Sequence, residues 1–480
     1  MTSIRIILLS LTAALGGFLF GFDSGVINGT VDALQKAFGS DALGTGFNVA
    51  SLLLGCAVGA FCAGTLADRF GRKPVMLATA IIFIVNAWGS GSAGSSFEFV
   101  CFRMLGGLAV GAASVLCPAY ISEIAPARVR GRLASLQQLM VVLGLFCSFL
   151  SNYLLARAAG GPGMALWGFH AWQWMYWMQI VPAGIFLFSL FLIPESPRYL
   201  VSAGKLREAA AVLKGVGHRD DAEEKVEEIR HSLKGDHHPR LGDLIDHSRR
   251  RLHSVVSTGI GLAAFQQLVG INVVFYYGAV LWKAAGFSEN DALFTNVIIA
   301  AINIGSTFVA MAIIDRIGRK PLLIVGSIGM TVTLGLLAAI FGSAAVMESG
   351  YLHLNPREGL WALIIANLYV FFFSASWGPV MWVLLGEMFP NRIRGVGVAI
   401  GGSFAWITNF IITMTFPIFL ARIGLGGAYA FYAAAAGISA IFVWKFVSET
   451  RGKRLEEMQM GSLPSGQSGN FKAANPESRC

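Results

Sequence analysis

Two charged side chains, Asp23 and Arg103, lie inside long apolar runs of this 480-residue chain. A charge within such a run is costly and is usually kept for a function. An acid beside a base remains ionised, whereas the same acid left alone in an apolar site takes up a proton. If the two side chains meet, they form either a fixed structural ion pair or a proton switch that opens and closes. The residues alone leave both possibilities open.

Amide and aromatic side chains in other apolar runs suit a neutral, hydroxyl-rich solute. An amide both donates and accepts hydrogen bonds, and an indole offers an apolar face on which such a solute can lie. The same amides could instead join neighbouring helices. The amides are Gln138, Gln266, Gln267, Asn272, Asn303 and Asn409, and the indoles are Trp382 and Trp406.

One of these runs holds three amides that a regular helix would not bring together. At about 100° per residue, Asn272 lies about 140° around the helix from Gln267. A break near Gly270 would let the amides converge, and solute sites in membrane proteins are often built on interrupted helices. We therefore expect the helix to be broken near Gly270.

Three charged motifs occur twice, and the copies of each are separated by roughly half the chain. The stretch Glu123-Ile-Ala-Pro-Ala-Arg-Val-Arg-Gly returns as Glu387-Met-Phe-Pro-Asn-Arg-Ile-Arg-Gly. Asp68–Lys73 likewise matches Asp315–Lys320, and Glu195–Arg198 corresponds to Glu449–Gly452. A shared offset indicates a duplicated half, and membrane-embedded repeats are typical of secondary transporters. The acids and bases of the first motif could pair across the halves or only stiffen a loop within each half.

The composition excludes an ordinary soluble protein. Hydrophobic residues make up 55% of the chain and charged residues 13%, against about 25% charged residues in soluble domains. Twelve apolar segments are long enough to cross the roughly 30 Å of hydrocarbon in a bilayer. They are 6–28, 46–66, 75–94, 98–119, 133–156, 172–193, 254–282, 291–314, 321–343, 360–386, 393–420 and 427–447. We predict an all-α membrane protein with twelve transmembrane helices in two pseudo-symmetric six-helix halves.

The basic residues of the short loops indicate the orientation. With both termini inside, the short inner loops carry eleven Lys and Arg residues and the outer loops five, as expected for cytoplasmic inner loops. We therefore predict cytoplasmic termini and a location in the plasma membrane, the inner membrane of a bacterium. The expected division is an N-terminal half at 1–197, a cytoplasmic linker with short amphipathic helices at 198–253, a C-terminal half at 254–455 and a disordered cytoplasmic tail at 456–480. The six cysteines are expected to be free thiols.

Several motifs together resemble the sugar porters of the major facilitator superfamily, and most closely the bacterial sugar:proton symporters for xylose, galactose, arabinose or glucose. They are Gly-x-x-x-Asp-Arg-x-Gly-Arg-Lys at 64–73, Arg103 with the Gly-Gly that follows it, Pro-Glu-Ser-Pro-Arg at 194–198, Gln-Gln-Leu-x-Gly-Ile-Asn at 266–272, Trp-Gly-Pro-Val-x-Trp at 377–382 and Glu-Thr-Arg-Gly-x-x-Leu-Glu-Glu at 449–457.

The resemblance implies roles for particular residues. The positions that match sugar-contacting residues are Gln138, Gln266, Gln267, Asn272, Asn303 and Trp382, and the aromatics around the pocket are Phe20, Tyr276, Tyr277 and Trp406. Asp23 and Arg103 match the proton-coupling pair. The residues that match a cytoplasmic gate are Asp68, Arg72, Glu123, Arg130, Asp315, Arg319, Glu387 and Arg394. Two positions depart from the family pattern, because Ala405 stands where relatives often carry an amide and Ser374 where animal facilitators carry an acid.

These observations predict a secondary active transporter that imports a monosaccharide with a proton by alternating access. Two other readings remain: a facilitative uniporter with an inert Asp23–Arg103 pair, and a non-transporting sugar sensor. No nucleophile–base pair or metal-ligand cluster is apparent, so we expect neither an enzyme nor a metal site, and no cofactor other than the proton as coupling ion. The expected partners are a monosaccharide and membrane lipids, without nucleic acid, and the protein is expected to work as a monomer.

Overall fold

The structure, a computed structural model, describes residues 4–126, 129–216, 221–235, 244–246, 251–346, 352–389 and 393–451. The N-terminal half contains α1 (Ile4–Val26), the 3-10 helix η1 (Ile27–Gly29), α2 (Val31–Phe38), α3 (Ala42–Phe70), α4 (Arg72–Ser92), α5 (Ser96–Ile124), α6 (Arg130–Ala159), β1 (Ala165–Leu166), β2 (Phe169–His170), α7 (Ala171–Trp177) and α8 (Ile180–Leu192). The linker contains α9 (Pro197–Ser202), α10 (Leu206–Gly215), α11 (Ala222–Gly235), β3 (Ile245–Asp246) and β4 (Arg251–Leu252). The C-terminal half contains α12 (Ser254–Leu268), α13 (Ile271–Ala284), α14 (Glu289–Ile317), α15 (Arg319–Ser343), β5 (Ala345–Val346), β6 (Leu352–His353), α16 (Pro356–Ser374), α17 (Trp377–Met388) and α18 (Arg394–Phe446).

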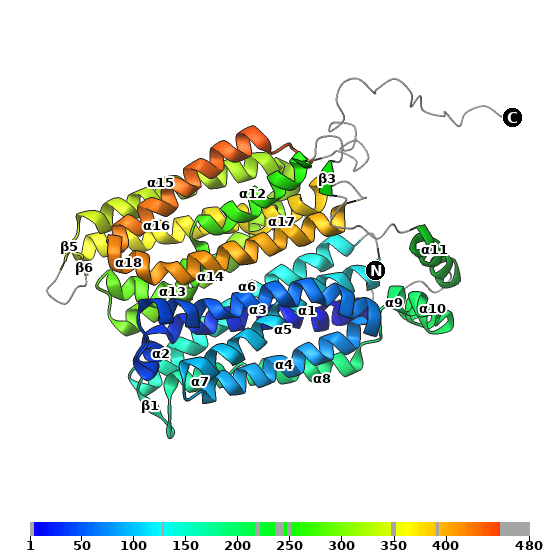
Figure 1. The fold of residues 1–480 in the computed structure, drawn as a ribbon, viewed down its shortest axis with the longest axis horizontal. Coiled ribbons are helices and arrows are strands. Elements are labelled where there is room, and N and C mark those ends of the chain that lie inside the picture. Colours follow the sequence, from blue (N-terminus) through cyan, green and yellow to red (C-terminus); the bar gives the residue numbers. More distant parts are fainter. Residues whose placement is uncertain are drawn as a thin grey trace.

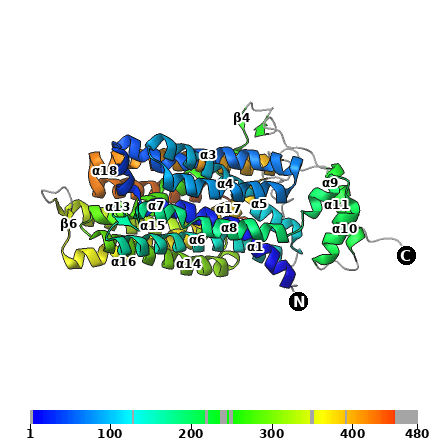
Figure 2. The ribbon, with the colours of Figure 1, turned by 90° about the horizontal axis from the view of Figure 1, so that it is seen from below.

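The long helices lie side by side along one axis of the molecule (Figures 1 and 2). The helices of the N-terminal half occupy one side of the bundle and those of the C-terminal half the other, and α3 packs on α18 and α6 on α14 where the halves meet. The linker helices α9, α10 and α11 lie at one end, which we call the linker end. The antiparallel strand pairs β1–β2 and β5–β6 lie at the opposite end, which we call the far end.

The number of spans agrees with the sequence. Among the described residues, eleven helical segments are long and apolar enough to cross a membrane. The last of them, Val396–Phe446, joins two helices, because Gly424 interrupts it with φ 68° and ψ −178°. The predicted spans 393–420 and 427–447 therefore form one kinked element, α18, and the prediction of twelve spans is confirmed.

Within the described chain three more spans are interrupted, and the sequence predicted only the break at Gly270. There α12 ends at Leu268 and α13 begins at Ile271, and Gly270 has a φ of 84°, in the left-handed region that favours glycine. The sixth predicted span is divided between α7 and α8, and the tenth between α16 and α17. In both, a proline (Pro182 or Pro379) is the third residue of the resumed helix, where its missing N–H is tolerated.

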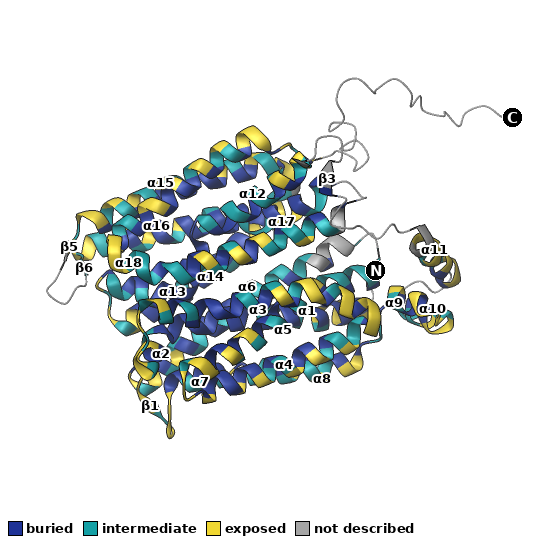
Figure 3. Ribbon diagram, viewed as in Figure 1, coloured by how far each residue is buried: buried dark blue, intermediate teal, exposed yellow. Residues whose placement is uncertain are grey.

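The outside of the bundle is apolar. Large side chains such as Phe61 (70% exposed), Phe188 (72%) and Leu192 (84%) point away from the protein, and exposed positions run along the outer helices (Figure 3). An apolar surface of this extent is stable in lipid rather than in water. The polar groups that the site requires are instead buried between the helices.

The amphipathic linker helices expected from the sequence are present. Leu213 of α10 and Val226 of α11 are buried, and α9, α10 and α11 pack on one another at the linker end. The cysteines that the structure describes are free, as predicted: Cys56, Cys62, Cys101, Cys117 and Cys147. Cys480 and the predicted tail at 456–480 lie outside the described residues.

Candidate functional site

Asp23 and Arg103 meet in the interior of the N-terminal half. Asp23 lies near the end of α1 and Arg103 lies in the first two turns of α5, and Nη1 of Arg103 is 2.9 Å from Oδ1 of Asp23. Both side chains are fully buried, with 0% exposure. Nη2 of Arg103 also donates to the backbone carbonyl of Asp23 at 3.4 Å. The contact expected from their positions in the sequence is therefore formed.

The surroundings of this pair leave one carboxylate oxygen without a donor. Nδ2 of Asn86 in α4 donates to Oδ1 of Asp23 at 2.9 Å, so this oxygen has two donors. Oδ2 of Asp23 and Nε of Arg103 are buried and have no hydrogen-bond partner in the described part of the chain. The guanidinium also lies over the ring of Tyr176, 5.7 Å from its centroid. A proton can therefore bind at Oδ2 without displacing an existing hydrogen bond.

The amides of the interrupted seventh span form a hydrogen-bonded chain. Nδ2 of Asn272 donates to Oε1 of Gln267 at 2.5 Å, and Nε2 of Gln267 donates to Oε1 of Gln266 at 3.0 Å. Nε2 of Gln266 donates to the backbone carbonyl of Trp377 at 3.2 Å, at the start of α17. The break at Gly270 thus brings together amides that a straight helix would separate, and the chain fastens one interrupted span to another.

The remaining sugar-site candidates lie in several separate contacts. Oδ1 of Asn303 accepts a hydrogen bond from the hydroxyl of Ser374 at 2.7 Å. The ring of Phe20 lies 5.7 Å from that of Trp406, so this aromatic contact joins the two halves. Trp382 is 41% exposed.

Gln138 is half-buried, and no described hydrogen bond or ring contact links it or Trp382 to the amide chain. Tyr276 and Tyr277 are buried, and the hydroxyl of Tyr277 donates to the carbonyl of Thr413 at 2.9 Å, which ties α13 to α18.

Sequence reasoning missed several buried amides, among them Asn86, Gln137 and Gln179. Asn86 contacts Asp23, and both amide atoms of Gln137 and of Gln179 are buried without a partner among the described residues. Each stands within a predominantly apolar run, which is the signal that could have identified it. Gln137 lies against Gly17 of α1, and Gln179 lies at the break between α7 and α8.

At the linker end of the N-terminal half, a network of charges joins the ends of several helices. Arg72 pairs with Asp68 and with Glu123, each at 3.0 Å, and the hydroxyl of Ser196 donates to Glu123. Glu195 accepts hydrogen bonds from the backbone N–H groups of Arg72, at 3.0 Å, and of the next residue, and so caps the N-terminus of α4.

The C-terminal half repeats this network with the matching residues of the second motif copies. Arg319 pairs with Glu387 through two contacts of 3.1 and 2.8 Å, and the hydroxyl of Thr450 donates to Glu387 at 2.6 Å. Glu449 accepts from the backbone N–H groups of Arg319 and Lys320 and caps α15 as Glu195 caps α4.

The position of Glu449 affects its acidity. Burial alone would raise the pKa of Glu449, but hydrogen bonds from the backbone N–H groups of Arg451, Arg319, Lys320 and Thr450 outweigh it and lower the pKa below its ordinary value. The described ion pairs of these two networks each lie within one half. The side chains of three further gate candidates, Arg130, Asp315 and Arg394, lie outside the described part of the structure.

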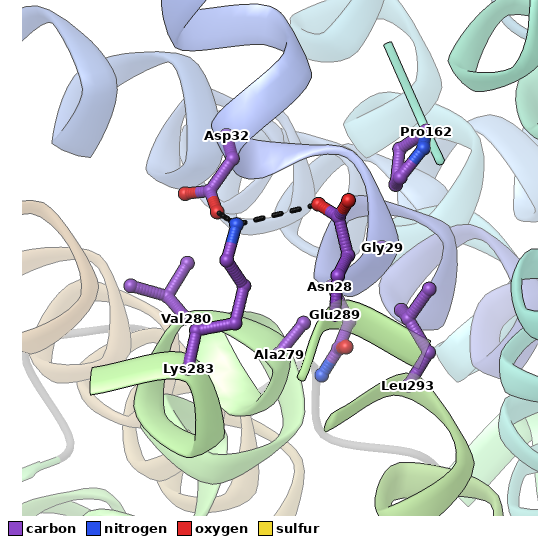
Figure 4. A pocket seen from close by; sticks show the side chains of 9 residues that line it. All are labelled: Asn28, Gly29, Asp32, Pro162, Ala279, Val280, Lys283, Glu289 and Leu293. Carbon is purple, nitrogen blue, oxygen red and sulfur yellow. Dashed lines mark hydrogen bonds and ion pairs between the residues drawn. The ribbon is translucent and has the colours of Figure 1, made fainter. Parts of the chain in front are cut away.

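At the far end, by contrast, polar contacts cross between the halves. Nζ of Lys283 in α13 lies 2.5 Å from Oδ2 of Asp32 in α2 and 3.3 Å from Oε1 of Glu289 in α14. These side chains line a small pocket together with Asn28 (Figure 4). Asn28 accepts a hydrogen bond from Asn296 at 2.9 Å and donates to the carbonyl of Phe275 at 2.9 Å. The two halves are therefore joined at this end by the Lys283–Asp32 ion pair and by the hydrogen bonds of Asn28.

Comparison with known proteins identifies the family. A family described as "Sugar (and other) transporter" matches residues 9–461. The glucose transport protein of Synechocystis is 51% identical over 455 residues, which cover 94% of this chain and 97% of that protein. The D-xylose-proton symporter of Escherichia coli K12 is 37% identical, and the match covers 94% of each chain. This chain belongs to the sugar transporter family.

The solved structures agree with the fold of this transporter. The inward-open xylose transporter of Escherichia coli superposes with a TM-score of 0.81 at 35% identity, covering 95% of this transporter and 99% of that chain. The proton:xylose symporter bound to 6-bromo-6-deoxy-D-glucose, a major facilitator superfamily protein, gives 0.78 at 36% identity, covering 96% and 100%. The predicted fold of two six-helix halves in a multi-pass membrane protein is confirmed, and so is the resemblance. Membership of a transporter family also agrees with the expectation that the protein is not an enzyme.

Proposed function

We propose that this protein imports a monosaccharide together with a proton by alternating access. The observation that carries the coupling is the fully buried Asp23, which pairs with Arg103 through Oδ1 and keeps Oδ2 free of donors. While the pair is closed, the carboxylate is favoured; when it separates, burial favours the protonated acid. The names of the relatives, a glucose transport protein and D-xylose-proton symporters, support the same reaction.

The sugar would bind to the amide chain and the neighbouring rings. Within the amide chain, Nδ2 of Asn272 donates to Gln267. The Oδ1 atom of Asn272 has no described partner, so a sugar hydroxyl can donate to it. Trp382, which is partly exposed, offers a face for the sugar ring. The proposed sugar-site residues are Gln138, Gln266, Gln267, Asn272, Asn303, Trp382, Trp406, Phe20, Tyr276 and Tyr277.

Alternation requires contacts that open at one end while they close at the other. We assign the linker end to the cytoplasm, with both termini inside, and the far end to the outside, on the bias of the basic residues. Lys283 and Asp32 then close the outer side, and the networks of Glu123 and Glu387 belong to an inner gate. The halves at 1–197 and 254–455 move against each other, the linker at 198–253 and the tail at 456–480 stay in the cytoplasm, and one chain suffices.

Uptake of labelled sugars into vesicles that contain the purified protein tests this function. We expect one or a few hexoses or pentoses to accumulate when a proton gradient is imposed, and only to equilibrate without it. Accumulation should disappear in Asp23→Asn. If a sugar equilibrates and the proton gradient has no effect, the protein is a facilitative uniporter. If no sugar is transported, the remaining interpretation is a non-transporting sugar sensor.

A further inference from the structure

The carboxyl group of Asp23 is held by an amide as well as by Arg103. Asn86 of α4 is fully buried, and its Nδ2 atom lies 2.9 Å from Oδ1 of Asp23. Ser90, one turn further along α4 and also fully buried, donates its hydroxyl to Oδ1 of Asn86 at 3.1 Å. This second hydrogen bond occupies the amide oxygen and so keeps the NH2 end of Asn86 turned toward Asp23. In the flipped orientation, the amide oxygen would face the carboxylate and repel it.

The neighbouring helix leaves space for this amide. A Cβ atom on Gly106 of α5 would lie 2.4 Å from Cγ of Asn86, so any larger residue at 106 would displace the side chain. Arg103 stands one turn before Gly106 on the same helix. The same stretch of α5 therefore supplies the base and the room for the amide.

The two donors to Oδ1 differ in how they respond to protonation. The guanidinium is permanently charged and favours the carboxylate, so it works against proton loading as long as it stays in place. The amide is neutral, and it can donate to Oδ1 in both forms, since the carbonyl oxygen of an acid still accepts, although its bond to the carboxylate is the stronger one. When Arg103 moves away, Asn86 can thus keep Oδ1 satisfied and Oδ2 available.

We propose that Asn86 is a positioning residue for the proton site, which rests on the proton coupling proposed above. Asn86, oriented by Ser90, anchors Oδ1 of Asp23 throughout the cycle, so that the proton binds at Oδ2. The only covalent change is the O–H bond, which forms at Oδ2 with a proton from water on loading and breaks on release to water.

Few other groups can contribute to this titration. The charged and titratable side chains that act on the pair are Arg103 itself, Cys56 of α3, Tyr176 of α7 and Tyr276 of α13. None of them is described as a donor to Oδ2. Arg103 and Asn86 are therefore the described side chains that donate directly to the carboxyl group of Asp23, both at Oδ1.

The test is infrared difference spectroscopy of the purified full-length protein over a pH series, with Asp23→Asn as the blank that identifies the Asp23 carbonyl band. A donor to the charged form favours that form, so Asn86→Ala should let Asp23 keep its proton to a pH higher by about one unit or more. Asn86→Asp, which has nearly the same shape, should shift the titration further because two acids then compete for one proton. Ser90→Ala should shift it less, in the same direction.

Asn48 provides the matched control. It is a buried amide of the same half that contacts Ser40 and Ser96 instead of Asp23, so Asn48→Ala should leave the Asp23 titration unchanged. An unchanged Asp23 band in both Asn86→Ala and Asn86→Asp would overturn the proposal. So would an equal shift in Asn48→Ala, because the effect would then come from general loosening of the fold.

Transport separates this proposal from the function on which it rests. In a coupled wild type, Asn86→Ala should move the pH dependence of proton-driven uptake toward alkaline pH, and in an Asp23→Asn background it should change sugar counterflow no further. If the wild type moves sugar without protons while Asn86 still controls the Asp23 titration, the proposed coupling fails and the positioning role stands. If the wild type is coupled and Asn86→Ala lowers uptake equally at every pH, the positioning role fails.

Discussion

The two halves of this transporter agree closely at the linker end and differ in their buried interiors. At the linker end, Arg72 pairs with Glu123 in one half, and Arg319 pairs with Glu387 in the other. The acid that follows the sixth span caps α4, and the acid that follows the twelfth caps α15. Even the glycines before these helices match, because Gly71 and Gly318 have φ values of 101° and 102°.

The first spans of the two halves show no such agreement in their buried polar residues. The first span of the N-terminal half, α1, runs unbroken to Val26 and carries Asp23, which is bound to a buried base. The first span of the C-terminal half is broken at Gly270 and carries neutral amides that bind one another. The buried ion pair thus lies in one half, and the amide chain on an interrupted span lies in the other.

The difference indicates where the two halves share a task and where they do not. Both halves hold their helix ends together at the linker end, and the duplicated motifs do this with the same residue types. Proton binding needs a group that can change its charge, whereas a neutral sugar needs groups that donate and accept without changing charge. The halves differ in the buried residues to which we assign these tasks.

The largest expected effect comes from removing the titratable group of the N-terminal half. Asp23→Asn should abolish accumulation of sugar against its gradient but leave counterflow largely intact, because only the proton site is lost. Labelled-sugar uptake and counterflow in vesicles measure the two. Asp41→Asn, which alters an exposed helix cap of the same half, serves as the control and should keep both. An Asp23→Asn protein that still concentrates sugar would show that the proton binds elsewhere.

Changes to the amide chain should weaken sugar binding without uncoupling it. Gln267→Ala and Asn272→Ala should each cost about 1–3 kcal/mol of binding free energy, because a buried hydroxyl or amide is left unsatisfied. Trp382→Ala should weaken binding through lost contact area with the sugar ring. Calorimetry on the purified protein measures the affinity.

The control for these variants is Asn367→Ala, which removes an amide that bonds only within its own helix α16. Unchanged affinity in all three site variants would move the sugar site away from the C-terminal half.

The matched networks at the linker end allow a direct test of the symmetry. The side chains of Arg72 and Glu123 are each 12% exposed, and those of Arg319 and Glu387 are 12% and 31% exposed, so removing one partner leaves a largely buried charge unpaired. Glu123→Ala and Glu387→Ala should shift the population toward inward-facing states by similar amounts and slow net transport, while sugar affinity changes little. Arg130→Ala is expected to act in the same way.

Distances between spin labels across the linker end report the shift. Glu208→Ala, which removes an exposed acid on α10, should leave these distances as they are in the wild type. Distances that stay unchanged in both gate variants would show that the networks only stiffen each half.

The smallest expected effect concerns the cap of α15. Because the pKa of Glu449 is lowered in the folded protein, its contribution to stability is complete above the ordinary pKa and is lost as the pH falls through the lowered value. Glu449→Gln should therefore lower the melting temperature at neutral pH, and the difference from wild type should shrink in acid. Glu208→Gln is the control. A constant difference at every pH would assign the effect to packing instead of charge.

The sequence predicted the parts of the fold that depend on local pattern. The twelve spans follow from apolar run length, and the break at Gly270 follows from three amides that could not otherwise meet. The breaks between α7 and α8 and between α16 and α17 were missed, although Pro182 and Pro379 mark them. Prolines alone did not identify breaks, because Pro118 and Pro417 lie inside helices.

The candidate site was predicted less completely, because its contacts join helices that are distant in sequence. The sequence singled out Asp23 and Arg103 because they are opposite charges inside apolar runs, and the structure shows that they pair. Asn86 carries no charge, so nothing in its own span shows that it faces Asp23. The cross-half contact of Lys283 with Asp32 was missed for a similar reason, since both residues lie near span ends, where charges are common.

The most direct test of the division between the halves is the number of protons that enter per sugar in sealed proteoliposomes. It is measured with a pH-sensitive dye inside and labelled sugar outside, for the wild type, Asp23→Asn and Gln267→Ala. We expect a fixed ratio in the wild type, a ratio near zero in Asp23→Asn, and an unchanged ratio in Gln267→Ala at a higher sugar concentration. A wild-type ratio that Asp23→Asn preserves, or that Gln267→Ala alters at saturating sugar, would contradict the account.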